Sequence, residues 1–109
     1  ISADAVLYIN WDSFLKKDIA GKQSVESITV SPNPFNPTTQ INFMLREAMH
    51  VKLNVYSITG QLVDTLIDRH LFPGNHNAVF SGQGFASGMY FYVLTTPRDS
   101  YKGKMLLAK

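Results

Sequence analysis

Short apolar segments that alternate with polar residues, separated by turn signals, dominate this chain. From residue 26 onward, clusters of glycine, proline, asparagine or serine recur every 8–14 residues. Between them, apolar side chains tend to occupy every second position, which is the period of a β-strand with one buried face. Short strands at such regular spacing are typical of an all-β sandwich or barrel.

The alternation predicts seven strands. Residues 62–67 break the period of two, so we expect a bulge there. Residues 89–95 are apolar on both faces, which predicts a central strand, and the last strand is expected to point Met105 and Leu107 inward. Seven strands in this length predict a seven-stranded antiparallel immunoglobulin-like β-sandwich. The predicted strands cover residues 27–31, 40–45, 50–56, 62–67, 75–80, 89–95 and 101–107.

The loop between the first two predicted strands carries three prolines in six residues. Each proline fixes φ at about −65° and removes a backbone donor. Each also disfavours helical geometry in the residue before it. We therefore expect a stiff, extended loop that marks where the domain begins. We call residues 32–37 the proline segment; its members are Pro32, Asn33, Pro34, Phe35, Asn36 and Pro37.

Residues 1–25 have a different character and predict an N-terminal extension. An apolar run over residues 5–9 favours a strand, and a capping pattern favours a short helix over residues 13–20. Two interpretations stay open: the end of an upstream domain with its linker, or an extra element packed on the sandwich, because Trp11 would be costly to expose. The sequence thus divides into residues 1–25 and a domain at 26–109.

Composition excludes several classes of function. A net charge of +2 is too small to predict binding to nucleic acid or anionic lipid. No segment approaches the roughly 20 apolar residues that span a bilayer. The absence of cysteine excludes disulfides and thiolate metal sites. Because the chain starts at Ile1 without a leader, we interpret it as part of a longer polypeptide.

No motif predicts catalysis, and none predicts a metal or cofactor site. Serine, histidine and aspartate all occur, but without a Gly-x-Ser-x-Gly elbow. The histidines lack the spacing of a zinc site. We expect His50 at a strand start and His70 in a loop to be solvated, and His76 to be partly buried and hydrogen-bonded. Asp64 and Asp68 do not have calcium-site spacing. We expect no enzyme activity and no cofactor.

Aromatic residues raise an alternative function, that of an immunoglobulin-like accessory, carbohydrate-binding or adhesion module of a modular secreted enzyme. Tyr90, Phe91 and Tyr92 could stack on sugars, but in a strand that is apolar on both faces they favour the core. Better candidates for exposed contacts are Trp11, Tyr8 and Tyr101.

Ordered motifs make residues 26–109 similar to a known family. The motifs are Ser-Pro-Asn-Pro-Phe-Asn-Pro-Thr-Thr at 31–39, Val-Tyr-Ser-Ile-Thr-Gly-Gln-Leu-Val at 55–63, Leu-Phe-Pro-Gly-Asn-His at 71–76, Ala-Ser-Gly-Met-Tyr-Phe-Tyr-Val-Leu at 86–94 and Lys-Gly-Lys-Met-Leu-Leu-Ala-Lys at 102–109. In order and spacing they resemble the C-terminal sorting domain of the type IX (Por) secretion system, an immunoglobulin-like module.

The resemblance implies delivery of an upstream cargo domain rather than catalysis. It implies transit through the periplasm to an outer-membrane secretion translocon, and a final location at the cell surface or outside the cell. A sortase-like peptidase can remove such domains, and the cut would fall near residues 21–26. The long form of the proline motif resembles that of modular enzymes and large surface proteins, so we expect export and leave cleavage open.

Recognition in this family is concentrated in the last two motifs. From the residues alone, the terminal lysines equally suit the solvated side of an edge strand, where they discourage unwanted pairing. A partner could recognise the final strand by pairing with its open edge or by binding its terminal carboxylate. The recognition residues that the resemblance implies are Gly88, Tyr90, Lys104, Met105, Leu106, Leu107 and Lys109.

Overall fold

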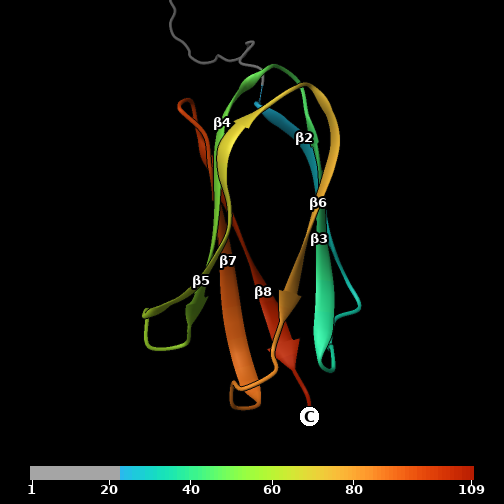
Figure 1. Ribbon diagram of the computed structural model, residues 1–109, viewed down its shortest axis with the longest axis vertical. Helices are drawn as coiled ribbons and strands as arrows, with labels where there is room; N and C mark the ends of the chain where they lie inside the picture. The colour runs from blue at the N-terminus through green and yellow to red at the C-terminus, as the bar shows by residue number, and fades with distance from the viewer. Residues whose placement is uncertain (1–22) are drawn as a thin grey trace, which may run out of the picture.

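The computed structural model describes residues 23–109, which form two antiparallel β-sheets packed face to face (Figure 1). This confirms the predicted all-β sandwich of seven strands. One sheet has the order β2-β3-β6 and the other β5-β4-β7-β8. The predicted strand at 5–9, the helix at 13–20 and Trp11 lie outside the described residues. The strands are β2 (Val25–Ser31), β3 (Thr38–Leu45), β4 (Met49–Ser57), β5 (Leu62–Leu71), β6 (Gly74–Ser81), β7 (Gly88–Thr95) and β8 (Ser100–Leu107).

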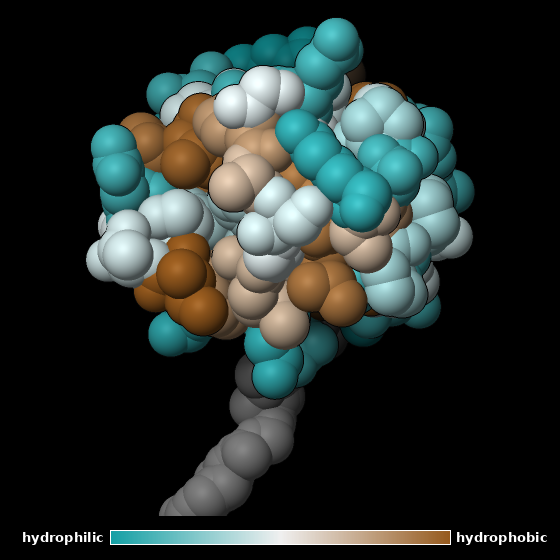
Figure 2. Space-filling model, turned by 90° about the horizontal axis from the view of Figure 1, so that it is seen from below, coloured by the Kyte–Doolittle hydropathy of each residue, from teal (hydrophilic) through white to brown (hydrophobic). Residues whose placement is uncertain are grey.

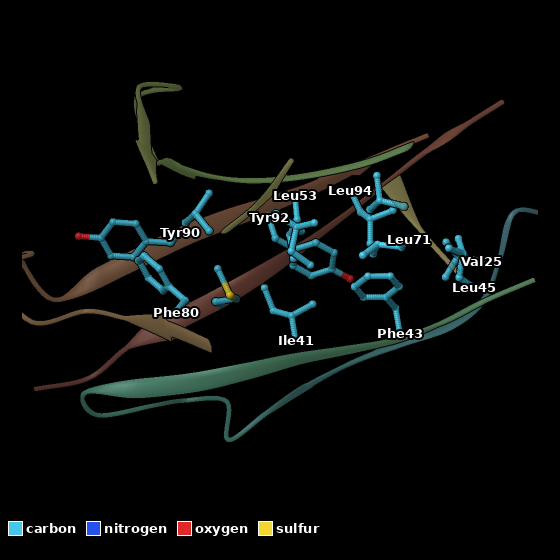
Figure 3. Close-up of a cluster of buried hydrophobic side chains, with 14 of the residues drawn as sticks. Val25, Ile41, Phe43, Leu45, Leu53, Leu71, Phe80, Tyr90, Tyr92 and Leu94 are labelled. Carbon is cyan, nitrogen blue, oxygen red and sulfur yellow. The ribbon is translucent and has the colours of Figure 1, made fainter. Parts of the chain in front are cut away.

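The core forms because alternate side chains of each sheet point at the other sheet. Figure 3 shows Ile41 and Phe43 of β3 facing Leu53 of β4 and Leu94 of β7 across the interior. All four are at most 2% exposed. Burial of this apolar surface is the main force that holds the two sheets together.

Strand β5 contains the predicted irregularity and extends beyond the predicted end. Its pairing with β4 shifts twice, so that Val63 and Leu66 have no partner in the register. Each bulge adds one residue and reverses which face the following residues occupy. Two bulges together restore the original alternation, and Leu71, opposite Met49, is buried at 4% exposure. The strand therefore continues through His70, and the prediction of a loop there is wrong, although His70 is exposed as expected.

Strand β7 is central, as its apolar sequence predicted, because it lies between β4 and β8. Tyr90 and Tyr92 are 6% and 8% exposed, which confirms that they belong to the core. Strand β8 is consequently an edge strand of this sheet. Its Met105 and Leu107 are buried, as predicted.

Candidate recognition site

The last two sequence motifs form one hairpin, β7–β8. The two strands pair along their full length, from Gly88 opposite Leu107 to Thr95 opposite Ser100. The structure therefore brings the implied recognition residues into one part of the sheet.

Alternation of side chains along the hairpin divides these residues into two groups. Tyr90, Met105 and Leu107 are at most 6% exposed, so their side chains face the core and not the solvent. The Tyr90 hydroxyl also donates a hydrogen bond to the Ala86 carbonyl at 2.6 Å. Lys104 is exposed on the outer face of the sheet.

The outer face of the hairpin carries residues outside the implied recognition set, and one of them, Phe91, was wrongly expected in the core. Met89, Phe91 and Val93 of β7 are partly exposed. They lie opposite Leu106, Lys104 and Lys102, respectively. The alternation of period two also identifies these residues, because they occupy the positions of each strand that do not face the core. We call these residues the β7–β8 outer face: Met89, Phe91, Val93, Lys102, Lys104 and Leu106.

The end of the hairpin is fixed by the backbone conformation of Gly88 and by a backbone hydrogen bond of Lys109. Gly88 has φ +148°, a value that side-chain-bearing residues rarely adopt. The Lys109 amide donates to the Ser87 hydroxyl at 3.1 Å. This end of the sandwich exposes apolar groups among polar ones (Figure 2).

The proline segment lies against the edge of β8. The Phe35 amide donates to the Leu106 carbonyl at 2.8 Å, and the Ala108 amide donates to the Phe35 carbonyl at 3.0 Å. Phe35 thus forms a parallel bridge to Leu107. In Figure 1 the loop between β2 and β3 lies beside the arrowhead of β8.

Asn33 extends this contact with its side chain. Its Nδ2 donates to the Lys104 carbonyl at 3.1 Å, and its Oδ1 accepts from the Leu106 amide at 2.9 Å. The expectation that the final strand has an open edge is therefore wrong over residues 104–108. A partner strand could add there only by displacing the proline segment.

The rest of the proline segment is anchored on the core side. Phe35 is 2% exposed, and its ring packs edge-on against Phe80 with centroids 5.9 Å apart. The Pro37 carbonyl accepts from the Gly82 amide at 2.7 Å, and the Pro32 carbonyl accepts from the Thr39 hydroxyl at 2.7 Å. The segment is a loop, as predicted, and its Pro34 and Asn36 are exposed. Its three X–Pro peptide bonds are cis.

Gly82 provides the space in which the end of β8 packs. A Cβ at this position would lie 2.7 Å from a methyl group of Leu107. That is well inside van der Waals contact, so any side chain at residue 82 would force Leu107 to move from its buried position. The β6–β7 loop, the proline segment and β8 therefore meet around one side chain.

A polar cluster fixes the opposite end of the sandwich. Asp99, in the β7–β8 turn, accepts hydrogen bonds from the Thr96 hydroxyl at 2.6 Å, the Tyr101 hydroxyl at 2.8 Å and the Ser24 amide at 3.2 Å. Burial alone would raise the pKa of Asp99, but these hydrogen bonds together outweigh burial and hold the pKa below its ordinary value of 3.8. The cluster ties the start of β2 to the turn of the hairpin.

The lowered pKa of Asp99 predicts acid-sensitive stability. The native state binds the Asp99 proton more weakly than the unfolded state does. The stabilisation of the fold by the Asp99 carboxylate is therefore complete above about pH 4 and is lost as the pH falls through the native pKa. Asp99→Asn should therefore flatten the fall in stability below pH 4, measured by urea unfolding between pH 7 and pH 2.5. An equally steep loss of stability below pH 4 in Asp99→Asn and the wild type would contradict the prediction.

Within residues 23–109, no group of three or more His, Asp or Glu side chains could hold a metal ion. His76 is partly buried and bonds the Phe72 carbonyl at 2.6 Å, as predicted, and His50 is exposed beside Asp68. In this part of the chain, no helix has the length and apolar character needed to cross a membrane.

Residues 29–108 match a family model described as the secretion system C-terminal sorting domain. The match includes the proline segment and ends at the residue after β8. No curated protein shows significant similarity to the chain.

Proposed function

Because this chain belongs to the family of secretion system C-terminal sorting domains, the sorting signals of type IX secretion, we propose that the secretion machinery recognises it through the β7–β8 outer face. A protein that carries such a signal is exported toward the cell surface or the extracellular space. The observation that carries the proposal is the partly exposed apolar row on β7, flanked by lysines of β8.

The chemistry of the β7–β8 outer face favours a protein partner with an apolar, acidic surface. Met89, Phe91 and Val93 offer apolar area that a partner can remove from water. Lys102 and Lys104 stand opposite Val93 and Phe91 and are exposed. Charges at the rim of such a surface steer association and select partners more than they add affinity.

The buried residues of the same motifs act indirectly in this proposal. Tyr90, Met105 and Leu107 hold the hairpin against the core and thereby fix the positions of Lys104 and Leu106. Removal of residues 88–109 would delete two strands and much of the core. Loss of export on truncation would therefore report unfolding as well as loss of recognition, and surface variants give a sharper test.

We further propose that transit runs through the periplasm to an outer-membrane translocon, with the cargo attached before β2. A sortase-like peptidase would then cut on the N-terminal side of Ser24. Ser24 and Val25 are 0% and 1% exposed, and their amides donate to Asp99 and Tyr101. Peptidases cleave extended, accessible backbone, which favours a site ahead of these residues.

Reversing the two lysines tests the docking surface. In a host with a type IX secretion system, a reporter fused to the Lys102→Glu/Lys104→Glu chain should reach the surface about tenfold less than the wild type, because the rim charges would repel the partner. Surface reporter is measured by labelling of intact cells. Urea unfolding of the purified chain should show a change within about 0.5 kcal/mol.

The matched control reverses two charges away from this face. Arg46 lies in the β3–β4 turn and Arg69 on β5, and both are exposed. Arg46→Glu/Arg69→Glu should leave export near the wild-type level. Equal export by the lysine variant and the wild type would overturn the proposed surface, and so would equal loss in both charge-reversed chains.

A further inference from the structure

We propose that Asn33 is a positioning residue: its carboxamide takes the place of a neighbouring strand at the edge of β8 and holds Lys104 and Leu106 in position for recognition. The part of this inference that concerns export rests on the proposed function. The part that concerns the strand can be measured on the isolated protein.

The hydrogen bonds of Asn33 have the pattern of a parallel β-ladder. In such a ladder, one residue donates to a carbonyl on the neighbouring strand and accepts from an amide two residues further along it. Backbone atoms of Phe35 do this with Leu106 and Ala108. The side chain of Asn33 does the same one step earlier, with Lys104 and Leu106. A planar carboxamide is suited to this because it carries a donor and an acceptor side by side.

Prolines explain why a side chain supplies these bonds. Pro32 and Pro34 have no backbone N–H, so the segment cannot build a continuous backbone ladder beside β8. The Asn33 side chain supplies the N–H donor that Pro32 and Pro34 lack. The prolines also leave few backbone N–H groups on the side of the segment that faces solvent. The segment thus covers the edge of β8 without offering a good edge of its own for a further strand.

The pairing matters for recognition because it fixes the register of the end of β8. A slip of one residue would exchange Leu106, which is 36% exposed, with Leu107, which is 1% exposed. It would also turn Lys104 away from the β7–β8 outer face. Since Asn33 contacts the backbone of both Lys104 and Leu106, it acts directly on two residues of that face.

Amide hydrogen exchange of the purified chain tests the positioning. Asn33→Ala removes both bonds, so the Leu106 amide should exchange about tenfold faster, or more, than in the wild type. The Leu53 amide, in the centre of β4, should keep its wild-type rate. Asn36→Ala is the matched control, because Asn36 also precedes a proline of the segment and is exposed. It should leave the Leu106 rate unchanged.

Asn33→Asp separates the two bonds of the carboxamide. A carboxylate still accepts from the Leu106 amide but cannot donate to the Lys104 carbonyl. The Leu106 rate in this variant should lie between those of the wild type and Asn33→Ala. A Leu106 rate that stays at the wild-type value in Asn33→Ala would overturn the inference.

Export of the fused reporter tests the role in recognition. Asn33→Ala should lower surface reporter several-fold, while Asn36→Ala should not. Faster exchange with unchanged export would overturn the role of Asn33 in recognition and leave the proposed function standing. Failure of the wild-type chain to direct export would instead overturn the proposed function, while the exchange result would still decide whether Asn33 holds β8.

Discussion

Replacing Phe35 with alanine should lower the free energy of unfolding by about 3–5 kcal/mol, the usual cost of removing a buried aromatic side chain. Phe35 is 2% exposed and its ring packs against Phe80. Its backbone is also the partner of Leu106 and Ala108, so loss of the ring removes the anchor of the proline segment. Urea unfolding followed by circular dichroism measures the change.

Phe72→Ala is the matched control, because Phe72 is 75% exposed. The same substitution there should change the free energy of unfolding by no more than about 0.5 kcal/mol. Similar losses in the two variants would show that the ring of Phe35 is not the anchor described above. In Phe35→Ala, the Ala108 amide should also lose its protection from exchange.

Replacing Leu107 with alanine should cost about 2–5 kcal/mol, because Leu107 is 1% exposed and packs closely on Gly82. Leu106→Ala should cost less than about 1 kcal/mol, since Leu106 is 36% exposed and faces outward. Export should fall in both variants for different reasons. Leu107→Ala lowers the fraction of the domain that is folded, whereas Leu106→Ala removes a recognition contact from a domain that stays folded.

Comparison of stability with export in these neighbouring variants tests the division of the hairpin into two faces. Unfolding measurements on the purified chains and surface labelling of the reporter give the two quantities. A Leu106→Ala chain as unstable as Leu107→Ala would contradict the register of β8. A Leu106→Ala chain with wild-type export would remove Leu106 from the β7–β8 outer face.

The strands could be predicted because each one buries a single face, which imposes a period of two on the sequence. Where that period holds, as in β3 and β4, the predicted and observed bounds agree within two residues. In β5 the bulges were predicted, but the strand was placed too short because three polar, exposed residues at 68–70 hide the alternation beyond Ile67. The sequence signal failed where polar residues occupy both faces of a regularly paired edge strand.

The contact between the proline segment and β8 could not be predicted in the same way. Asn33 and Lys104 are 71 residues apart, and a polar side chain in a loop has no periodic pattern. The assignment of recognition residues was limited for a different reason. It combined both faces of the hairpin, so Met105 and Leu107 were grouped with Lys104, although the alternation already separates them.

The pairing of the proline segment with β8 also orders events during protein synthesis. Asn33 and Phe35 leave the ribosome early, but the residues they bind, 104–108, follow about 70 residues later. At about 5–20 residues per second, the segment waits several seconds or more for its partner. A chain that stops short of residue 104 lacks Met105 and Leu107 as well, and cannot close the sandwich. The sandwich therefore closes only after translation has reached its last strand.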